Sequence, residues 1–171
     1  MNNALPGVPL WQRARSLTDA ELANVPWLGA LSRAEQQRAA AAMRVATAQS
    51  GDLLCRIGKA PTYWFGVIDG LLKMSNDNSR AAPVTFTGLP PGAWFGEGTL
   101  LKREPYRYNI QALRRSTVAG LPIDAFHELL DTSVPFNRFV LRQLNERLGQ
   151  FIAAVEHDRL DDTDSRVARG L

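Results

Sequence analysis

The stretch PGAWFGEGTLL, residues 91–101, is the most distinctive part of the chain, and Arg107 follows it closely. Gly96 and Gly98 flank a lone carboxylate, Glu97, ahead of a short segment that can form a single helical turn through Thr99. Glycine lets the backbone approach a ligand closely, and N–H groups at the start of a helix favour an anion. These residues predict a turn that binds a negatively charged group.

Glu97 and Arg107 lie ten residues apart and offer complementary chemistry. The guanidinium of an arginine is a forked donor that suits a phosphate. An ionised glutamate can only accept hydrogen bonds, so it suits sugar hydroxyls. A phosphate ester that carries hydroxyls would satisfy both side chains. The alternative is that Glu97 and Arg107 pair with each other across a turn.

Around this stretch, residues 45–122 consist of short apolar or alternating runs separated by turn residues. Asp69-Gly70 between two apolar runs is a strong signal for a tight turn. Strands this short and this closely spaced indicate a sandwich or barrel rather than alternating strands and helices. The predicted strands are residues 52–57, 63–68, 71–75, 83–87, 93–95, 108–113 and 117–121.

The N-terminal part is predicted to be helical over residues 17–44. The tetrapeptides TDAE (residues 18–21) and SRAE (residues 32–35) both fit a capping box, in which a hydroxyl and a carboxylate satisfy free N–H groups at a helix start. Pro26 lies between them, so we expect a short helix, a break and a longer helix. Residues 1–16 show no clear period and are predicted to form an arm.

The C-terminal part is helical again over residues 123–159. Asp124 is expected to cap a first helix, and Ser133 a second, longer one. The second helix carries apolar residues at alternating spacings of three and four, as in a two-stranded coiled coil. This stripe either packs on the β core of its own chain or forms a homodimer interface, and we favour the homodimer. The predicted interface residues are Leu141, Leu144, Leu148, Phe151 and Val155.

Composition excludes several classes of protein. The 171 residues are 45% hydrophobic and 22% charged, with a formal net charge of +3. No run reaches the roughly 18 apolar residues of a membrane-spanning helix, and the N-terminus lacks a secretory signal pattern. Cys55, the single cysteine, excludes a disulfide framework and a multi-cysteine metal site, and we expect it to be a buried, inert thiol. We therefore expect a cytoplasmic protein without a membrane partner or a metal.

Motifs of common enzyme classes are missing. The sequence holds no zinc-protease HExxH, no P-loop and no GxSxG nucleophile turn. Its two histidines, His127 and His157, are predicted to lie near helix ends at the surface. We do not expect an enzyme.

Taken in this order and spacing, the glycine-marked strands, Phe-Gly-Glu, the arginine and the long helix resemble the cyclic nucleotide receptor domain of the CRP/FNR transcription regulators. The resemblance covers residues 27–171. It implies an α+β fold, with an antiparallel β-roll (a double-stranded β-helix or jelly roll) and N-terminal helices over residues 17–134. It also implies a long dimerisation helix over residues 135–160, and a hinge with the truncated start of a DNA-binding domain over residues 161–171.

The resemblance also assigns roles. In the family, the residue that matches Glu97 holds the ribose 2′-hydroxyl, and the residue that matches Arg107 binds the cyclic phosphate. The expected effector is cyclic AMP, cyclic GMP or a related nucleotide, and no other cofactor is expected. The expected partners are this effector, a second copy of the chain, and DNA only through the missing domain. The candidate nucleotide-binding residues are Gly96, Glu97, Gly98, Thr99, Arg107, Tyr108, Phe151 and Ile152.

The chain departs from the family pattern at three of these positions. Tyr108 follows the phosphate arginine where the family has a small residue. Phe151 and Ile152 stand where the cyclic AMP receptor offers hydroxyls to adenine, and they can pack on a purine but cannot hydrogen-bond it. A second hypothesis is therefore a ligand-independent dimerisation module, in which Tyr108 and Phe151 fill a degenerate pocket.

Overall fold

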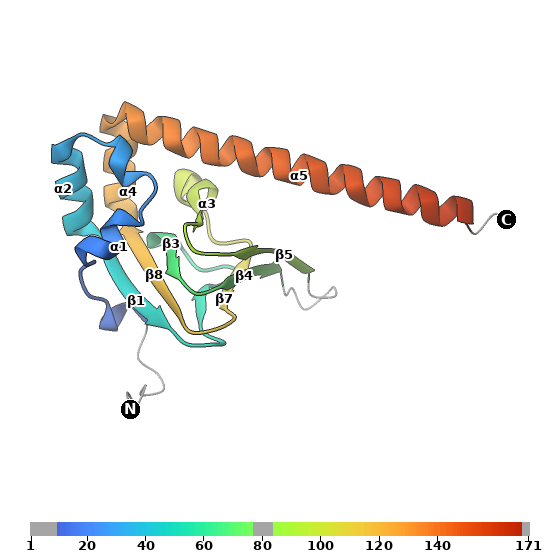
Figure 1. Ribbon diagram of the computed structural model, residues 1–171, viewed down its shortest axis with the longest axis horizontal. Helices are drawn as coiled ribbons and strands as arrows, with labels where there is room; N and C mark the ends of the chain where they lie inside the picture. The colour runs from blue at the N-terminus through green and yellow to red at the C-terminus, as the bar shows by residue number, and fades with distance from the viewer. Residues whose placement is uncertain (1–9, 77–83, 169–171) are drawn as a thin grey trace.

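The computed structural model describes the backbone of residues 10–76 and 84–168, and the side chains of residues 10–76 and 85–153. Within these ranges, two four-stranded antiparallel sheets form a β-roll, and the α+β prediction is confirmed (Figure 1). The first sheet has the order β1 (Arg44–Ala48), β8 (Ser116–Pro122), β3 (Tyr63–Asp69) and β6 (Trp94–Phe95). The second has the order β2 (Leu53–Cys55), β7 (Asn109–Ala112), β4 (Leu72–Asn76) and β5 (Val84–Leu89).

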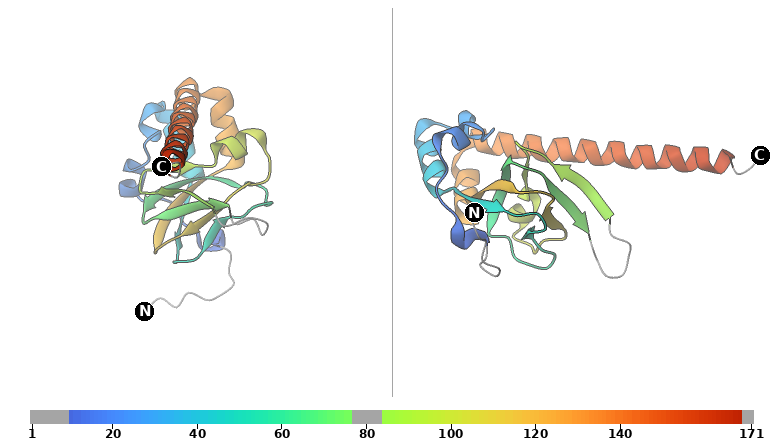
Figure 2. Two further views of the ribbon diagram at one scale, coloured as in Figure 1. Left: turned by 90° about the vertical axis from the view of Figure 1, so that its right-hand side faces the viewer. Right: turned by 60° about the horizontal axis from the view of Figure 1, so that its bottom comes forward.

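Helices gather at one end of the roll and along its top. The short helices near the N-terminus and α4 lie together at one end, and α5 runs over the roll and past it (Figures 1 and 2). The six-residue helix α3 lies between the sheets and α5 (Figure 1). The helices are η1 (Leu10–Arg13), α1 (Asp19–Ala23), η2 (Leu28–Ala30), α2 (Arg33–Ala42), α3 (Glu97–Lys102), α4 (Ile123–Thr132) and α5 (Val134–Ala168).

The predicted strand positions are confirmed, with one addition. Each predicted run contains a strand, with ends that differ by a few residues. The additional strand is β1, which pairs with β8 from Arg44 to Ala48. Its small residues give only weak alternation in the sequence, so its place depends on its pairing partner. The Asp69-Gly70 turn is confirmed, because Gly70 has a φ of +108° and a Cβ there would collide with Ser116.

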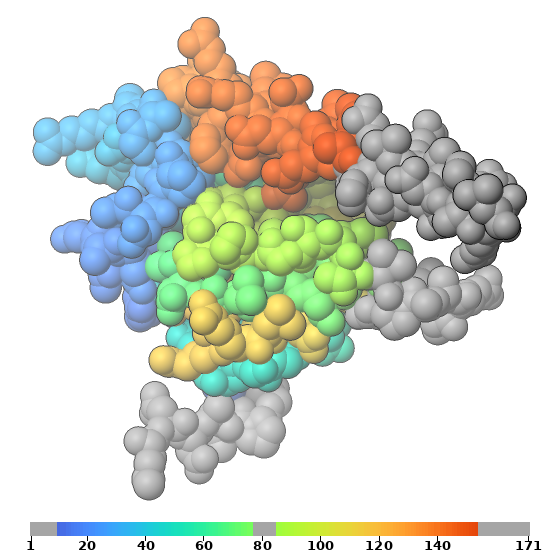
Figure 3. Space-filling model, turned by 45° about the vertical axis from the view of Figure 1, so that its right-hand side comes forward, coloured from blue at the N-terminus to red at the C-terminus, as the bar shows by residue number. Residues whose placement is uncertain are grey.

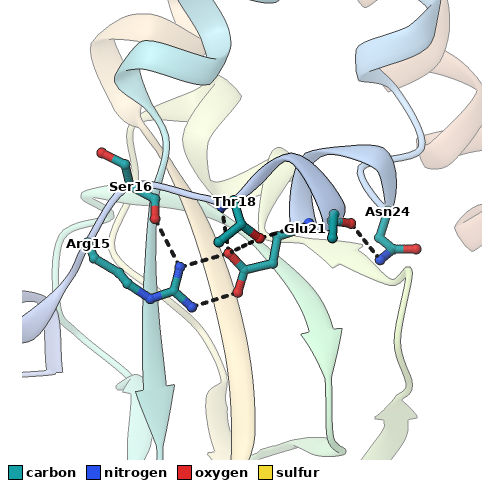
Figure 4. A network of polar contacts seen from close by, with 6 residues as sticks. Arg15, Ser16, Thr18, Glu21 and Asn24 are labelled. Atoms are coloured by element: carbon teal, nitrogen blue, oxygen red, sulfur yellow. Dashed lines mark hydrogen bonds and ion pairs between the residues drawn. The ribbon is translucent and has the colours of Figure 1, made fainter.

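Both predicted capping boxes are present. The Thr18 hydroxyl accepts from the N–H of Glu21, and the Glu21 carboxylate accepts from the N–H of Thr18 (Figure 4). Ser32 and Glu35 make the same reciprocal pair at the start of α2. The expected cap at Asp124 is wrong, because α4 begins at Ile123 after Pro122 and no side chain caps it. Asp124 instead lies in the first turn, where its negative charge interacts favourably with the helix dipole.

Residues 10–16 differ from the expected arm. Trp11 stacks on Tyr63 of β3, with ring centroids 4.6 Å apart, and Arg15 pairs with Val45 of β1. Gly120 lies directly beneath the Trp11 ring, and a Cβ there would come within 2.9 Å of it. Packing of Trp11 therefore holds this segment against the first sheet. Residues 1–9 lie outside the described residues.

An aromatic cluster joins the N-terminal helices, the first sheet and the start of α5. Trp64 of β3 packs against Trp94 of β6, Trp27 before η2 and Phe136 of α5, with centroid separations of 4.6 to 5.5 Å. All four side chains are fully buried. Burial of an aromatic side chain stabilises a domain more than most single contacts do, so this cluster fixes the start of α5 on the roll.

Helix α5 is longer than predicted. It begins at Val134, after the Ser133 hydroxyl accepts from the N–H of Phe136, as expected for a helix start. Its backbone continues to Ala168, through residues 161–164 that were predicted to form a hinge. The hinge prediction is wrong because no glycine or proline interrupts this segment before Gly170. The helix spans about 52 Å at 1.5 Å per residue. Among the described residues, no helix combines the length and apolar character that crossing a membrane requires.

Candidate functional site

Glu97 lies at the centre of the candidate site. Strand β6 ends at Phe95, and Gly96 turns the chain with a φ of +97° so that α3 begins at Glu97. Only a residue without a side chain adopts this backbone conformation readily. The turn directs Glu97 inward, where the residue is 1% exposed. A buried carboxylate needs a partner, and the partner comes from a distant part of the chain.

That partner is Arg147 of α5. Its Nε lies 2.7 Å from Oε1 of Glu97, and its Nη2 donates to the backbone carbonyl of Trp94. The Arg147 side chain is 33% exposed, so it reaches the carboxylate from the solvent side. One arginine thus ties α5 to both the end of β6 and the start of α3.

The second oxygen of Glu97 is unsatisfied. Oε2 is buried and has no hydrogen-bond partner among the described residues. Desolvation by burial raises the pKa of Glu97, and the Arg147 charge opposes that rise. A buried carboxylate oxygen without a partner is an open acceptor, so a hydroxyl group would be well placed to donate to it.

Glu97 lines a pocket of about 350 Å³ beneath α5. Figure 3 shows the described part of α5 (orange) lying directly over the segment that includes β5 and α3 (yellow-green). The pocket mixes apolar walls with both signs of charge. Its lining residues are Met74, Gly96, Glu97, Gly98, Thr99, Lys102, Glu104, Pro105, Arg107, Tyr108, Leu144 and Arg147.

Arg107 lies at the edge of this pocket. Its side chain is 82% exposed, and its Nη2 lies 3.1 Å from Oε2 of Glu104. The alternative that Glu97 and Arg107 pair with each other is therefore wrong. Arg107 pairs with Glu104, and Glu97 pairs with Arg147. An exposed ion pair three residues apart contributes little to stability. The guanidinium of Arg107 is consequently free to exchange Glu104 for another anion.

The hydroxyl groups of Tyr108 and Thr99 lie side by side in the lining of the pocket. Their hydroxyl oxygens lie 3.3 Å apart, and the Tyr108 hydroxyl lies 3.7 Å from where a Cβ on Gly96 would stand. Burial raises the pKa of Tyr108 to about 12, so its hydroxyl is neutral at pH 7 and can donate. The structure thus brings together Gly96, Glu97, Gly98, Thr99, Arg107 and Tyr108, as predicted from the sequence.

The two predicted base contacts lie elsewhere. Phe151 is 67% exposed and Ile152 is 48% exposed, and neither lines the pocket. Helix α5 instead reaches the pocket one and two turns earlier, through Arg147 and Leu144. The ligand-independent alternative supposed that Phe151 fills the pocket, and the structure places Phe151 outside it.

The predicted dimer residues share one face of α5 and differ in burial. Leu144 packs against the core and lines the pocket. Leu141, Leu148 and Phe151 are all more than half exposed. The side chain of Val155 lies outside the described residues, as does that of His157.

Other reactive side chains are remote from the site or inert. Cys55 is buried as predicted, and burial raises its pKa to about 12. His127 is partly buried within α4, with Nε2 3.1 Å from the carbonyl oxygen of Leu100. In the part of the chain that the structure describes, no three His, Cys, Asp or Glu residues group in a way that could hold a metal ion.

Arg147 is the site residue that sequence reasoning missed. It stands among the polar residues that flank the apolar stripe of α5, and no role was predicted for it from the sequence. The available signal was its position three residues after Leu144, because residues three apart share one face of a helix. A charged residue on a face that packs against the core indicates a buried partner.

Comparisons with known proteins agree with this geometry. Residues 45–133, just over half of the chain, match the family model of the cyclic nucleotide-binding domain. A cyclic nucleotide-gated potassium channel of Mesorhizobium japonicum is 29% identical over 133 residues, covering 78% of this chain and 36% of the channel. The chain therefore spans about a third of the length of that relative.

Solved structures with the same fold come from different kinds of protein. The sensor domain of the transcriptional regulator DNR from Pseudomonas aeruginosa has a TM-score of 0.66 at 20% identity, over 78% of this chain and 89% of that one. A cyclic nucleotide-binding domain from Methylobacillus flagellatus KT has a TM-score of 0.69 at 18% identity, over 86% and 89%. Identities this low support the fold alone.

Proposed function

Since the chain belongs to the cyclic nucleotide-binding domain family, we propose that it is a sensor that binds cyclic AMP, cyclic GMP or a related nucleotide and passes the binding event to α5. It acts by binding and not by turnover. The proposal rests above all on one observation, the buried Glu97 carboxylate that faces the pocket with one oxygen held by Arg147 and the other free.

The two ends of such a nucleotide match the two ends of the pocket. A ribose hydroxyl donates to Oε2 of Glu97, which is the free acceptor. The cyclic phosphate takes the guanidinium of Arg107 away from Glu104, since a phosphate accepts a bidentate pair. The neutral hydroxyls of Thr99 and Tyr108 line the same pocket and can donate to the phosphate. No contact is assigned to the base.

Transmission to α5 follows from the position of Arg147. The same carboxylate that accepts the ribose hydroxyl also holds Arg147, so the ligand and the helix share one residue. A ligand shifts a helix only when it binds the two helix positions with different affinity. Sharing Glu97 supplies that difference, because a hydroxyl on Oε2 changes how strongly Oε1 attracts the guanidinium.

We further propose that α5 carries a homodimer interface. Leu141, Leu148 and Phe151 are spaced seven and three residues apart along α5, and each is more than half exposed. Large apolar side chains in one line along a helix favour pairing with a second such helix. The remaining predicted residues, Leu144 and Val155, extend the same rhythm.

The output of the sensor is proposed by analogy. The structural similarity to the DNR sensor domain, together with a long helix at the C-terminal end, supports a CRP/FNR-like transcription regulator whose DNA-binding domain lies outside this chain. The related potassium channel carries a similar domain for a different output. A lone cysteine without a disulfide accords with the cytoplasm as the place of action.

Calorimetry tests the proposed function. The wild-type domain is titrated with cyclic AMP and with cyclic GMP, beside Arg107→Ala. Arg115→Ala is the matched control, because Arg115 is an exposed arginine in the turn between β7 and β8. We expect saturable binding of at least one nucleotide, weakened about tenfold or more by Arg107→Ala and unchanged by Arg115→Ala. Wild-type protein that binds neither nucleotide would favour the ligand-independent dimerisation module.

The dimer is tested separately by sedimentation velocity. Leu148→Glu places a charge in the exposed stripe, and we expect it to convert a dimer into a monomer. Gln150→Glu adds the same charge at an exposed polar position two residues after Leu148, on the opposite side of the helix, and should leave the dimer intact. A wild-type monomer at high micromolar concentration would contradict the proposed interface.

A further inference from the structure

Trp64 occupies a special position beside the site. Strands β3 and β6 are antiparallel neighbours, with Phe65 opposite Phe95 and Gly66 opposite Trp94. Extending this register by one residue brings Trp64 opposite Gly96, the residue before Glu97. Trp64 is thus a fully buried residue beside the turn that carries Glu97, while Arg147 reaches the carboxylate from the side of the solvent.

Two buried polar atoms meet here without an aligned partner. The indole N–H of Trp64 has no hydrogen-bond acceptor, and Oε2 of Glu97 has no donor. One is a donor and the other an acceptor. The two groups are still close enough to interact, because hydrogen bonding from the Trp64 side chain lowers the pKa of Glu97 against the larger rise from desolvation. Buried polar groups in native proteins are rarely left unpaired without a functional reason.

The direction of the indole is fixed by its neighbours. Its ring packs against Trp94 at 4.6 Å, Phe126 at 5.3 Å and Phe136 at 5.5 Å, and it is fully buried. Side chains packed this densely do not change rotamer freely. The indole N–H therefore has a fixed direction.

We propose that Trp64 is a positioning residue for Glu97. Its indole N–H donates to Oε2 when a nucleotide hydroxyl donates to the same oxygen, because a carboxylate oxygen can accept two hydrogen bonds. This proposal deepens the proposed function and rests on it for the role of the ligand. Trp64 and Arg147 then hold the carboxylate between them, each on one oxygen.

The first test needs no nucleotide. Indole N–H resonances are followed by ¹H–¹⁵N correlation spectroscopy as the pH is lowered, in the wild type and in Glu97→Gln. We expect the Trp64 resonance to shift with the protonation of Glu97 and this titration to vanish in Glu97→Gln. Trp27 is the internal control, because it is equally buried and its N–H is equally unpartnered. A Trp64 resonance with the same pH titration in the wild type and in Glu97→Gln would overturn the proposal.

The second test uses cyclic AMP as the probe, with Trp64→Phe and the matched control Trp27→Phe. Both variants keep an aromatic ring and lose an N–H. We expect Trp64→Phe to weaken binding about tenfold and Trp27→Phe less than twofold. The pH below which binding is lost should also move upward in Trp64→Phe, because Glu97 loses a group that favours its charged form.

The outcomes separate this proposal from the proposed function. Failure of the wild type to bind cyclic AMP counts against the proposed function, while the resonance titration still decides whether Trp64 holds Glu97. Equal affinities of Trp64→Phe and Trp27→Phe in a protein that does bind would overturn the role of Trp64 and leave the nucleotide site standing.

Discussion

Two arginine–glutamate pairs in this molecule have the same contact distance and opposite character. In the first, Nη1 and Nη2 of Arg15 each lie 2.7 Å from one oxygen of Glu21, and the N–H of Thr18 adds a further bond (Figure 4). In the second, Nε of Arg147 lies 2.7 Å from one oxygen of Glu97, and the other oxygen has no partner. The first carboxylate is fully satisfied, and the second is half satisfied.

The pKa values of the two glutamates differ accordingly. Hydrogen bonds from Arg15 lower the pKa of Glu21 to about 2. Burial raises the pKa of Glu97 in spite of Arg147. The comparison teaches that an ion pair which satisfies every polar atom serves the stability of the fold. An ion pair that leaves a buried oxygen without a partner indicates a role in function, here the binding of a ligand.

The largest effect is expected from removing the arginine at the site. Arg147→Ala leaves the buried Glu97 without a countercharge, and we expect it to lower the free energy of unfolding by about 2–3 kcal/mol, a cost moderated by the partial exposure of Arg147. Arg15→Ala should cost about 1 kcal/mol, because that pair lies nearer to solvent. Urea denaturation at pH 7 measures both. Equal costs would show that the two pairs do not differ as described.

The pH dependence of the two pairs is expected to have opposite sign. Glu21 has a lowered pKa, so its contribution to stability is present above its ordinary value of 4.5 and is lost as the pH falls towards 2. Glu97 has a raised pKa, so its contribution is present below 4.5 and is lost as the pH rises through the raised value. Screening limits the Glu21 contribution to about 1 kcal/mol.

Urea titrations from pH 3 to pH 7 on Glu21→Gln and Glu97→Gln measure this difference. Relative to the wild type, Glu21→Gln should become more destabilising as the pH rises. Glu97→Gln should become less destabilising over the same range. Parallel curves for the two variants would rule out the contrast between the two carboxylates.

A smaller effect is expected from the cap that supports the first pair. Thr18→Ala removes the hydroxyl that accepts from the N–H of Glu21, and loss of such a cap costs about 1 kcal/mol. Thr18→Ser keeps the hydroxyl and should remain within a few tenths of a kcal/mol of the wild type. Nucleotide affinity should be unchanged in both, since α1 does not line the pocket of Glu97. Thermal denaturation and calorimetry together check this.

The smallest effect is expected at Tyr108. Tyr108→Phe removes a hydroxyl that lies 3.3 Å from Oγ1 of Thr99, and we expect a stability loss of about 0.5 kcal/mol, because that contact is long. The effect on nucleotide affinity should be a two- to fivefold weakening, if the hydroxyl donates to the phosphate as proposed. An increase in affinity would mean that Tyr108 obstructs the pocket instead of contributing to it.

Local signals in the sequence predicted most of the fold. The capping boxes, the Asp69-Gly70 turn and the segment from Gly96 to Thr99 depend on neighbours in the chain, so their residues alone indicate what they form. Strand β1 has no such signal, because its place depends on pairing with β8, about seventy residues away. The extension of α5 beyond residue 160 was missed because polar residues were taken for a hinge.

The site divides in the same way. Glu97, Thr99, Arg107 and Tyr108 come from one short stretch and could be predicted together. Arg147 and Trp64 reach Glu97 from α5 and β3, and no spacing along the chain connects them to it. The pairing of Arg107 with Glu104 instead of Glu97 is likewise a result of tertiary structure, since α5 provides Glu97 with a closer arginine.

The central claim is that the half-satisfied carboxylate of Glu97 is a ligand site. Titration calorimetry with cyclic AMP at pH 7, on the wild type, Glu97→Gln and Glu21→Gln, tests it most directly. The account predicts that Glu21→Gln binds within twofold of the wild type, while Glu97→Gln binds about a hundredfold more weakly, because an amide replaces the charged acceptor. A Glu97→Gln variant that binds cyclic AMP as tightly as the wild type would contradict the account.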